Sequence, residues 1–300
     1  MTTLTDFLTA KRTVEDRALN RVVFERFVDE LSARAVDDEP VRIVEIGVGT
    51  GSMIARLAEW NALPSVVSYR AIDLDSETLA VAQRRLPDQL RAAGYTVEVD
   101  GSMIVARKES TDGSDRRLDI TLDVGDGFAV DDQADAVIAS AVLDLVDLPA
   151  AVDKAQQLLV DDGLLYAPFT FNGHTSFWPD HPQDELIETL YHRHMDEIRD
   201  QPGHSRAGQQ LLSALPESGY AVLEAGGADW VIQPADSAYP HDESTALAHL
   251  LSTIDGALAD YPTEALESST RDEWVKTRRD QLERGELTLV AHHMDVLAQR

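Results

Sequence analysis

The sequence contains no cysteine, few lysines and no long apolar run. The absence of cysteine excludes disulfides, thiolate nucleophiles and cysteine-ligated zinc. The first residues, MTTLTDFLTAKRTVEDR, lack the apolar core of a signal peptide, and no later stretch approaches the length of a membrane span. We therefore expect a cytoplasmic protein, and we expect no membrane as a partner.

Positive charge is also scarce. Asp and Glu outnumber Lys and Arg by 54 to 26, which gives a formal net charge of −28, and lysine occurs only at positions 11, 108, 154 and 276. Affinity for a polyphosphate depends on clustered Lys and Arg, and the sequence contains no such cluster, so nucleic acid is not an expected partner. Two interpretations of the acidic surface remain: adaptation to high salt, as in a halophilic protein, or an ordinary acidic cytosolic protein.

What the chain does contain is enough apolar sequence for a sizeable core, since 43% of its 300 residues are hydrophobic. Apolar periodicity predicts an amphipathic helix from about Thr13 to Leu31, and a buried strand over residues 41–46. Alternation over residues 95–124, with turns at Asp100-Gly101 and Asp112-Gly113, predicts a β-hairpin inserted before the third core strand. Further strands are expected at residues 66–74, 136–139, 164–169, 220–224 and 287–292, and further helices at residues 149–159, 242–260 and 264–284.

This alternation of strands and helices predicts an α/β fold with a doubly wound, mostly parallel seven-stranded sheet, the β-hairpin insertion and helical cap insertions. The last strand is expected to be antiparallel. No linker divides the chain, so we expect one domain over residues 1–300, with a cofactor-binding core at about 41–170. The cap on the acceptor side is expected at about 171–204, and the helical insertion at about 231–285.

The strongest motif is a strand, a glycine loop and a helix over residues 44–54. Glycine is required where the backbone turns sharply or touches a ligand, and the helix N-terminus offers free N–H groups to an anion. The spacing is G-x-G-x-G, and Ser52 stands where the dinucleotide fingerprint needs Gly or Ala. The motif therefore favours a carboxylate and a nucleoside over a pyrophosphate.

Three further motifs follow at the ends of successive strands. Residues 71–75 carry Asp73, which lies 22 residues after Gly51 and suits bidentate hydrogen bonding to two ribose hydroxyls. Residues 123–128 carry Asp126, a carboxylate that can accept a hydrogen bond from an adenine amino group. Residues 139–145 end the fourth core strand. Ligands of open α/β sheets bind at the carboxyl ends of parallel strands, so the four motifs predict one site.

In this order the motifs resemble those of the class I (Rossmann-like) S-adenosylmethionine-dependent methyltransferase family, over about residues 41–170. Glu45, Gly47, Gly49 and Gly51 match the pattern E-x-G-x-G-x-G. A looser resemblance to bacterial small-molecule methyltransferases covers residues 140–147, 171–173, 228–230 and 292–295, and carries no substrate. The resemblance implies S-adenosyl-L-methionine as cofactor, with binding residues Glu45, Gly47, Gly49, Gly51, Asp73, Leu74, Asp126, Gly127 and Ser140.

The acceptor site is expected above the strand ends, in the segment that follows the fifth core strand. His174 is the candidate general base, with a surface histidine as the alternative interpretation. The candidate acceptor-binding residues have ordinary packing or a solvated surface as their alternative, and they are Trp178, Tyr191, His194, Arg206 and Trp230. His192 and His194 stand two apart on a predicted helix and cannot share a face, so no metal site is expected.

The leading functional hypothesis is methyl transfer to an oxygen or nitrogen of a small-molecule acceptor by in-line displacement. Two alternatives remain open. One is a protein of the same fold that uses S-adenosylmethionine for a reaction other than methylation, and the other is a nonenzymatic protein that binds it. The features that discriminate between these hypotheses lie on the acceptor side of the site.

Overall fold

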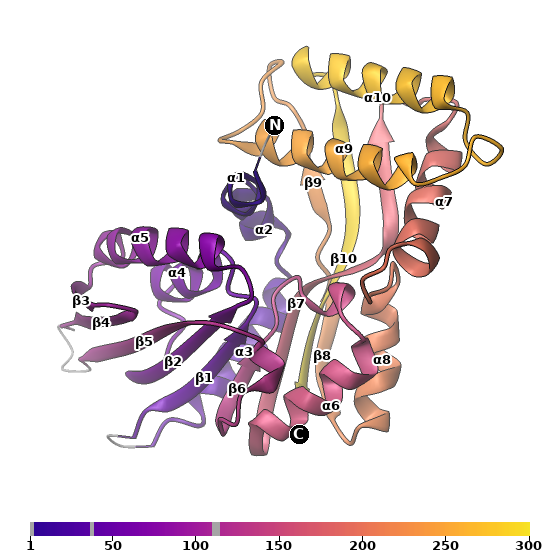
Figure 1. The fold of residues 1–300 in the computed structure, drawn as a ribbon. Helices are drawn as coiled ribbons and strands as arrows, with labels where there is room; N and C mark the ends of the chain where they lie inside the picture. The colour runs from indigo at the N-terminus through magenta and orange to yellow at the C-terminus, as the bar shows by residue number, and fades with distance from the viewer. Residues whose placement is uncertain (1–2, 37–38, 110–114) are drawn as a thin grey trace.

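The computed structural model describes residues 3–36, 39–109 and 115–300, and its centre is one mixed β-sheet (Figure 1). The strand order is β3-β4-β5-β2-β1-β6-β7-β10-β8, and β9 pairs with β10 beside this path. The strands are β1 (Val41–Ile46), β2 (Val66–Asp73), β3 (Thr96–Asp100), β4 (Met103–Lys108), β5 (Arg116–Val124), β6 (Ala134–Ile138), β7 (Leu159–Trp178), β8 (Ala221–Gly227), β9 (Trp230–Ile232) and β10 (Thr288–Gln299).

The middle of the sheet is parallel and its edges are not. The pairs β5-β2, β2-β1, β1-β6 and β6-β7 are parallel, whereas β10 is antiparallel to β7, β8 and β9. The predicted hairpin is present as β3 and β4, which turn at Gly101 and extend the sheet beyond β5. Because of the hairpin and β9, the sheet has ten strands and not seven, and five of its nine pairings are antiparallel. The turn predicted at Asp112-Gly113 lies outside the described residues.

Helices cover both faces of the sheet. Successive side chains of a strand point to opposite faces, so Ile43 and Ala71 pack with α3, α4 and α5, while Val44 and Ile72 pack with α6 and α8. The helices are α1 (Leu4–Ala10), α2 (Arg12–Ala18), α3 (Arg21–Ser32), α4 (Ser52–Glu59), α5 (Ser76–Ala92), α6 (Leu148–Leu158), α7 (Asp184–Arg193), α8 (Ala207–Glu217), α9 (Glu243–Ala259) and α10 (Ser268–Glu283), with short turns η1 (Gly127–Ala129), η2 (Leu143–Leu145) and η3 (His194–Ile198).

Strands β7 and β10 extend well past the rest of the sheet. The prediction ended the fifth strand at Phe169 and placed a cap directly after it, but β7 continues to Trp178, where it pairs with Thr288 of β10. Phe169 has a positive φ of 59°, which marks the point where the strand leaves the core. Helices α7, α9 and α10 pack around the far ends of β7 and β10 and form an upper part of the molecule (Figure 1).

The N-terminal helix is broken, contrary to the prediction of one helix over Thr13–Leu31. Asn20 separates α2 from α3, because its side-chain oxygen accepts hydrogen bonds from the backbone N–H groups of Val22 and Val23 (3.1 and 3.3 Å) and caps α3. The backbone N–H groups of Asn20 and Phe169 each donate to the buried carboxylate of Asp295, at 2.8 Å. Asp295 thereby fixes the corner between α2 and α3 to the bend in β7.

None of the helices in the described part of the chain combines the length and the apolar character needed to cross a membrane.

Candidate functional site

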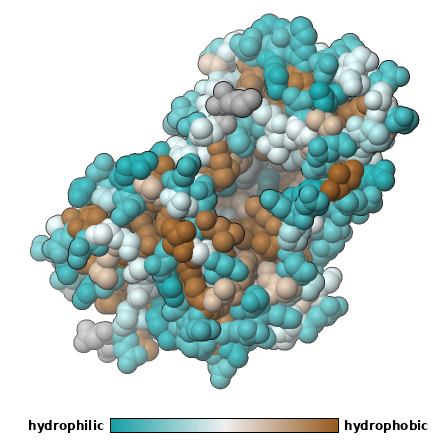
Figure 2. Space-filling view, viewed as in Figure 1, coloured by the Kyte–Doolittle hydropathy of each residue, from teal (hydrophilic) through white to brown (hydrophobic). Residues whose placement is uncertain are grey.

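A cavity of about 640 Å³ lies at the carboxyl ends of β1, β2, β5 and β6. The space-filling view shows hydrophobic residues around a hollow between the core and the upper part (Figure 2). We call this space the first cavity. Eight of the nine predicted cofactor-binding residues line it: Glu45, Gly47, Gly49, Asp73, Leu74, Asp126, Gly127 and Ser140. The four motifs, separated by up to a hundred residues in sequence, thus meet at one space.

The glycine loop lines the cavity with its backbone. Gly47 and Gly49 have φ angles of +71° and +55°, which side chains rarely tolerate, and a Cβ on Gly47 would lie 2.5 Å from Val142. Gly51 does not line the cavity. It precedes α4 with φ +82°, and a Cβ there would lie 2.8 Å from Leu86 of α5. Gly51 therefore permits the close approach of α4 to α5, and the first two glycines leave the loop open to a ligand.

Asp73 ends β2 and is held in one orientation. Its two carboxylate oxygens accept hydrogen bonds from the backbone N–H groups of Gly49 (2.8 Å) and Asp75 (2.9 Å). Each carboxylate oxygen can accept more than one hydrogen bond, so both retain capacity for a ligand hydroxyl. The glycine loop and the strand end thus position the carboxylate before any ligand arrives.

The loop after β5 places a second carboxylate at the cavity. One oxygen of Asp126 accepts from the backbone N–H of Phe128 (2.9 Å), and the other has no such bond within the loop. Gly127 lies so close to β1 that a Cβ would meet Ile46 at 2.9 Å. Leu74, whose surface is 76% exposed, and Phe128 also line the cavity. The first cavity therefore offers two apolar side chains and an acceptor at the same end.

Glu45 of β1 lines the first cavity, and its side chain is buried. The hydroxyl of Tyr69 donates a hydrogen bond to its carboxyl group (2.7 Å). Burial raises the pKa of Glu45 to about 8, although Tyr69 and Arg56 favour the ionised form. The carboxyl group is therefore mostly protonated at neutral pH in the absence of a cationic ligand.

The N-terminal helices supply charged residues that the sequence analysis did not assign to the site. Lys11 and Glu15 line the first cavity and form an ion pair at 2.8 Å, and Glu15 also pairs with buried Arg56 of α4 at 3.2 Å. Burial opposes ionisation of Glu15, but Lys11 and Arg56 outweigh it, and the pKa of Glu15 is lowered. Arg12, the neighbour of Lys11, pairs with Glu59 and does not line the cavity. The cavity thus has a fixed pair of opposite charges at the end that faces α2.

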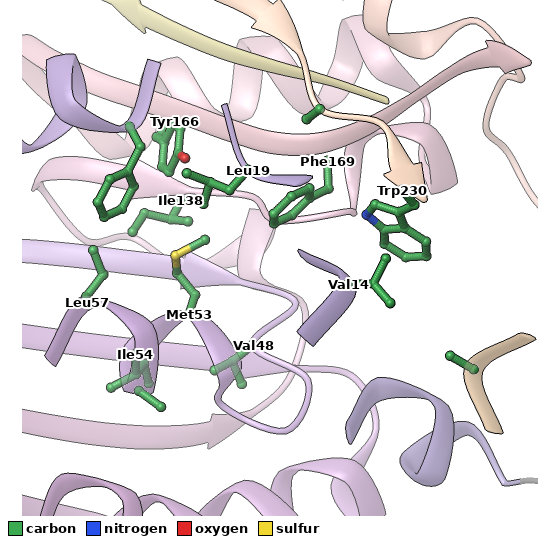
Figure 3. Close-up of a cluster of buried hydrophobic side chains, with 14 of the residues drawn as sticks. Val14, Leu19, Val48, Met53, Ile54, Leu57, Ile138, Tyr166, Phe169 and Trp230 are labelled. Atoms are coloured by element: carbon green, nitrogen blue, oxygen red, sulfur yellow. The ribbon is translucent and has the colours of Figure 1, made fainter. Parts of the chain in front are cut away.

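A second cavity, also of about 640 Å³, adjoins the first and lies between the core and the upper part. The two cavities share six lining residues, Leu4, Leu8, Lys11, Ala141, Leu145 and Gln201, which we call the junction. The predicted acceptor-binding residues Tyr191, His194 and Trp230 line the second cavity. Figure 3 shows Phe169 and Trp230, two of its aromatic residues, beside Val14 of α2.

The other predicted acceptor-side residues lie elsewhere. His174 lies on the extended part of β7, where its side chain is 55% exposed and pairs with Glu188 at 2.8 Å. Trp178 is 61% exposed at the end of the same strand, and Arg206 is exposed directly before α8. None of the three lines either cavity. His174 and Trp178 lie away from the cavities because residues 171–178 belong to the extended strand β7 and do not form a loop over the site.

Three polar side-chain atoms of the described residues are buried around the second cavity without a hydrogen-bond partner: Asp144 Oδ1, Arg199 Nε and Trp230 Nε1. Burial raises the pKa of Asp144, against the opposing effects of backbone N–H groups and of the charges of Lys11 and Arg199. Burial lowers the pKa of His293, which also lines this cavity, to about 4, so its ring is neutral. Buried polar atoms are usually paired, so these three atoms are exceptions in the wall of the second cavity.

Among residues 3–36, 39–109 and 115–300, no group of three or more His, Asp or Glu side chains is placed to hold a metal ion.

No family model and no curated protein matches the chain. Solved structures similar to it include a Bacillus halodurans C-125 protein to which methyltransferase activity has been ascribed (TM-score 0.48, 14% identity, covering 91% of this chain and 97% of that one). Geranyl diphosphate C-methyltransferase of Streptomyces coelicolor A3(2), solved with S-adenosyl-L-homocysteine, has a TM-score of 0.44 and 14% identity, covering 92% and 76% of the two chains. YjhP of Escherichia coli has a TM-score of 0.45 and 13% identity, covering 98% and 99%. At these levels of similarity the function must be argued from the chain's own residues.

Proposed function

We propose that this protein is an S-adenosylmethionine-dependent methyltransferase that acts on a small-molecule acceptor. One observation carries the proposal: the glycine loop, Asp73 and Asp126 line one cavity, and a second, largely apolar cavity adjoins it along the junction. A protein that only bound the cofactor would need the first cavity alone. The second cavity is what favours group transfer over the nonenzymatic alternative.

The residues of the first cavity fit the chemical groups of the cofactor in order. The carboxylate of Asp73 suits the two ribose hydroxyls, and Asp126 suits the adenine amino group, with Leu74 and Phe128 against the ring. Lys11 and Glu15 also line the first cavity. The ammonium of Lys11 suits the carboxylate of the cofactor, and the carboxylate of Glu15 suits the amino group of the cofactor. These residues would hold both ends of the cofactor, which would supply its methyl group from the first cavity.

The bound cofactor supplies an electrophilic methyl group, and the chain's residues provide alignment and a dry environment. An oxygen or nitrogen of the acceptor attacks the methyl carbon in line with the departing sulfur, so the enzyme must hold both partners in one geometry. We assign acceptor contacts to Tyr191, His194 and Trp230, which line the second cavity. We assign no step to His174.

Calorimetry with S-adenosylhomocysteine and with NAD tests the proposal. We expect the wild-type protein to bind S-adenosylhomocysteine and not NAD. Asp73→Ala removes a charge-assisted acceptor for two hydroxyls, so its affinity should fall by about 2–4 kcal/mol, on the order of 30-fold to 1,000-fold.

Asp161→Ala is the matched control, because the side chain of Asp161 is 100% exposed and lies outside both cavities. It should bind as the wild type does. Thermal unfolding of both variants separates loss of binding from loss of folding. Tight binding of NAD without binding of S-adenosylhomocysteine would refute the proposed function, and unchanged affinity in Asp73→Ala would place the ribose elsewhere.

A further inference from the structure

The second cavity is lined mainly by apolar and aromatic side chains. Phe7, Phe171 and Tyr191 line it, together with Trp230, whose ring stacks on His293 at a centroid distance of 4.5 Å. Aromatic walls favour flat apolar ligands, which they contact by offset stacking and by edge-to-face packing. The second cavity is suited to a ring compound of drug-like size, because its volume of about 640 Å³ lies within the range of small-molecule binding sites.

The charges around this cavity do not suit a highly charged ligand. Two cations, Lys11 and Arg199, and two carboxylates, Asp144 and Asp260, line it among the described residues. Lys11 is already paired with Glu15, and Asp260 pairs with His194 at 2.8 Å. A phosphorylated acceptor would meet about as much negative as positive charge there. Burial of a charged group costs desolvation free energy unless opposite charge compensates it, and an uncharged acceptor avoids this cost.

Asp144 lines the second cavity, next to the junction in sequence. It belongs to the segment after β6, in which Ser140 lines the first cavity, Ala141 and Leu145 line both, and Asp144 lines the second. Its buried Oδ1 has no hydrogen-bond partner, whereas its carboxyl group as a whole is affected by the backbone N–H groups of Asp144 and Phe171 and by the charges of Lys11 and Arg199. A buried oxygen without a partner is costly, and a hydroxyl group of a ligand would satisfy it.

Arg199 adjoins Asp144 and adds a donor. One of its terminal nitrogens donates to the backbone carbonyl of Asp144 (3.0 Å), while its Nε is buried and has no hydrogen-bond partner. The backbone bond holds the guanidinium beside the carboxyl group. Asp144 and Arg199 thus place a buried unpaired acceptor and a buried unpaired donor in the wall of the second cavity.

We propose that the acceptor is an uncharged, largely apolar ring compound bearing a hydroxyl group, and that Asp144 Oδ1 accepts the hydrogen bond of this hydroxyl and takes its proton during methyl transfer. This inference rests on the proposed function. The bond that forms joins the acceptor oxygen to the methyl carbon, and the bond that breaks joins that carbon to the sulfonium sulfur. The hydroxyl proton passes to Asp144, which releases it to water after the methyl ether departs.

Binding of simple arenes to the protein saturated with S-adenosylhomocysteine tests the recognition step. The probes are 2-naphthol and 2-methoxynaphthalene, which share a ring system but differ in the donor. The wild type should bind 2-naphthol about 10-fold or more tightly than the ether, as expected for a hydrogen bond to a charged group. Asp144→Ala should lose this preference. Equal binding of the two probes by the wild type, or failure to bind 2-naphthol at all, would overturn the inference.

Transfer of the methyl group to 2-naphthol tests the proton step. Asp144→Asn can still accept a hydrogen bond but cannot take a proton, so it should retain the binding preference while kcat falls by about 100-fold or more. Asp161→Asn, which changes an exposed carboxylate in the same way, should keep the wild-type rate. An Asp144→Asn protein with the wild-type kcat would contradict the role of Asp144.

Binding of S-adenosylhomocysteine, measured in the same proteins, separates the two levels of the argument. If the wild type fails to bind it, the proposed function itself fails. If every protein binds it equally and only the preference for 2-naphthol is missing, the proposed function stands and the assignment of Asp144 falls.

Discussion

Glu45 is a single residue whose ionisation is tied to folding. Its pKa in the folded protein is about 8, against an ordinary value of 4.5, because burial disfavours the carboxylate. Between these two pH values the folded state holds a proton that the unfolded state has released. The free energy of unfolding should therefore be highest below about pH 4.5 as far as Glu45 is concerned, and should fall as the pH rises toward about 8.

Glu45→Gln removes this titration while it keeps a neutral polar group of the same shape. The stability of the wild type relative to Glu45→Gln should decline with pH by up to about 1.4 kcal/mol per pH unit within that window. Urea denaturation of both proteins across the window measures the difference. Two stability curves that remain parallel would show that Glu45 ionises normally in the folded protein.

The residues of the first cavity were predictable where the motif is local. The glycine loop, Asp73 and Asp126 each follow a strand directly, and parallel strand ends converge whatever the rest of the chain does. Lys11 and Glu15 could not be assigned in this way, because they reach the cavity only through the packing of α2 against α4. The sequence offered one signal for this ion pair, which is that Lys11, one of only four lysines, stands four residues before Glu15.

Helices α2 and α4 are joined by a buried ion network. Arg56 of α4 is fully buried and donates to Asp16 (2.6 Å) and Glu15 (3.2 Å) of α2. Arg56→Met leaves Glu15 without one of its two cations, and the loss of one partner from a buried pair typically costs about 3–5 kcal/mol. We expect a loss of this size in the free energy of unfolding, measured by chemical denaturation.

Arg26→Met is the matched control within α3. Arg26 is exposed and pairs with Glu30 one helical turn away, so its replacement should cost about 0.5 kcal/mol or less. If the two variants lost the same stability, the network would not join the helices.

The elements whose bounds were predicted least well are those that pair with segments far away in the sequence. The pattern of apolar residues predicted β6 and α6 closely, but it ended the strand that corresponds to β7 at Phe169. In the structure, residues 170–178 remain a strand since β10, more than a hundred residues later, pairs with them. Likewise Asn20, which interrupts the predicted first helix, is fixed by Asp295 at the other end of the chain.

The whole molecule carries a formal charge of −28, so its folded state repels itself at low ionic strength. We expect the melting temperature to rise with added salt. If the surface is adapted to high salt, the rise should continue past about 1 M, where the Debye length is roughly 3 Å and simple screening is complete. Scanning calorimetry in KCl from low to multimolar concentration measures this. A flat melting temperature between low and molar salt would favour an ordinary acidic protein.

The two adjoining cavities define where the cofactor and the acceptor bind in the proposed enzyme. A crystal structure of the protein with S-adenosylhomocysteine tests this arrangement. We expect the ribose hydroxyls to contact Asp73 and the sulfur to face the junction, toward Ala141, Leu145 and the second cavity. A ligand bound outside the first cavity, or one whose sulfur faces away from the second, would contradict it.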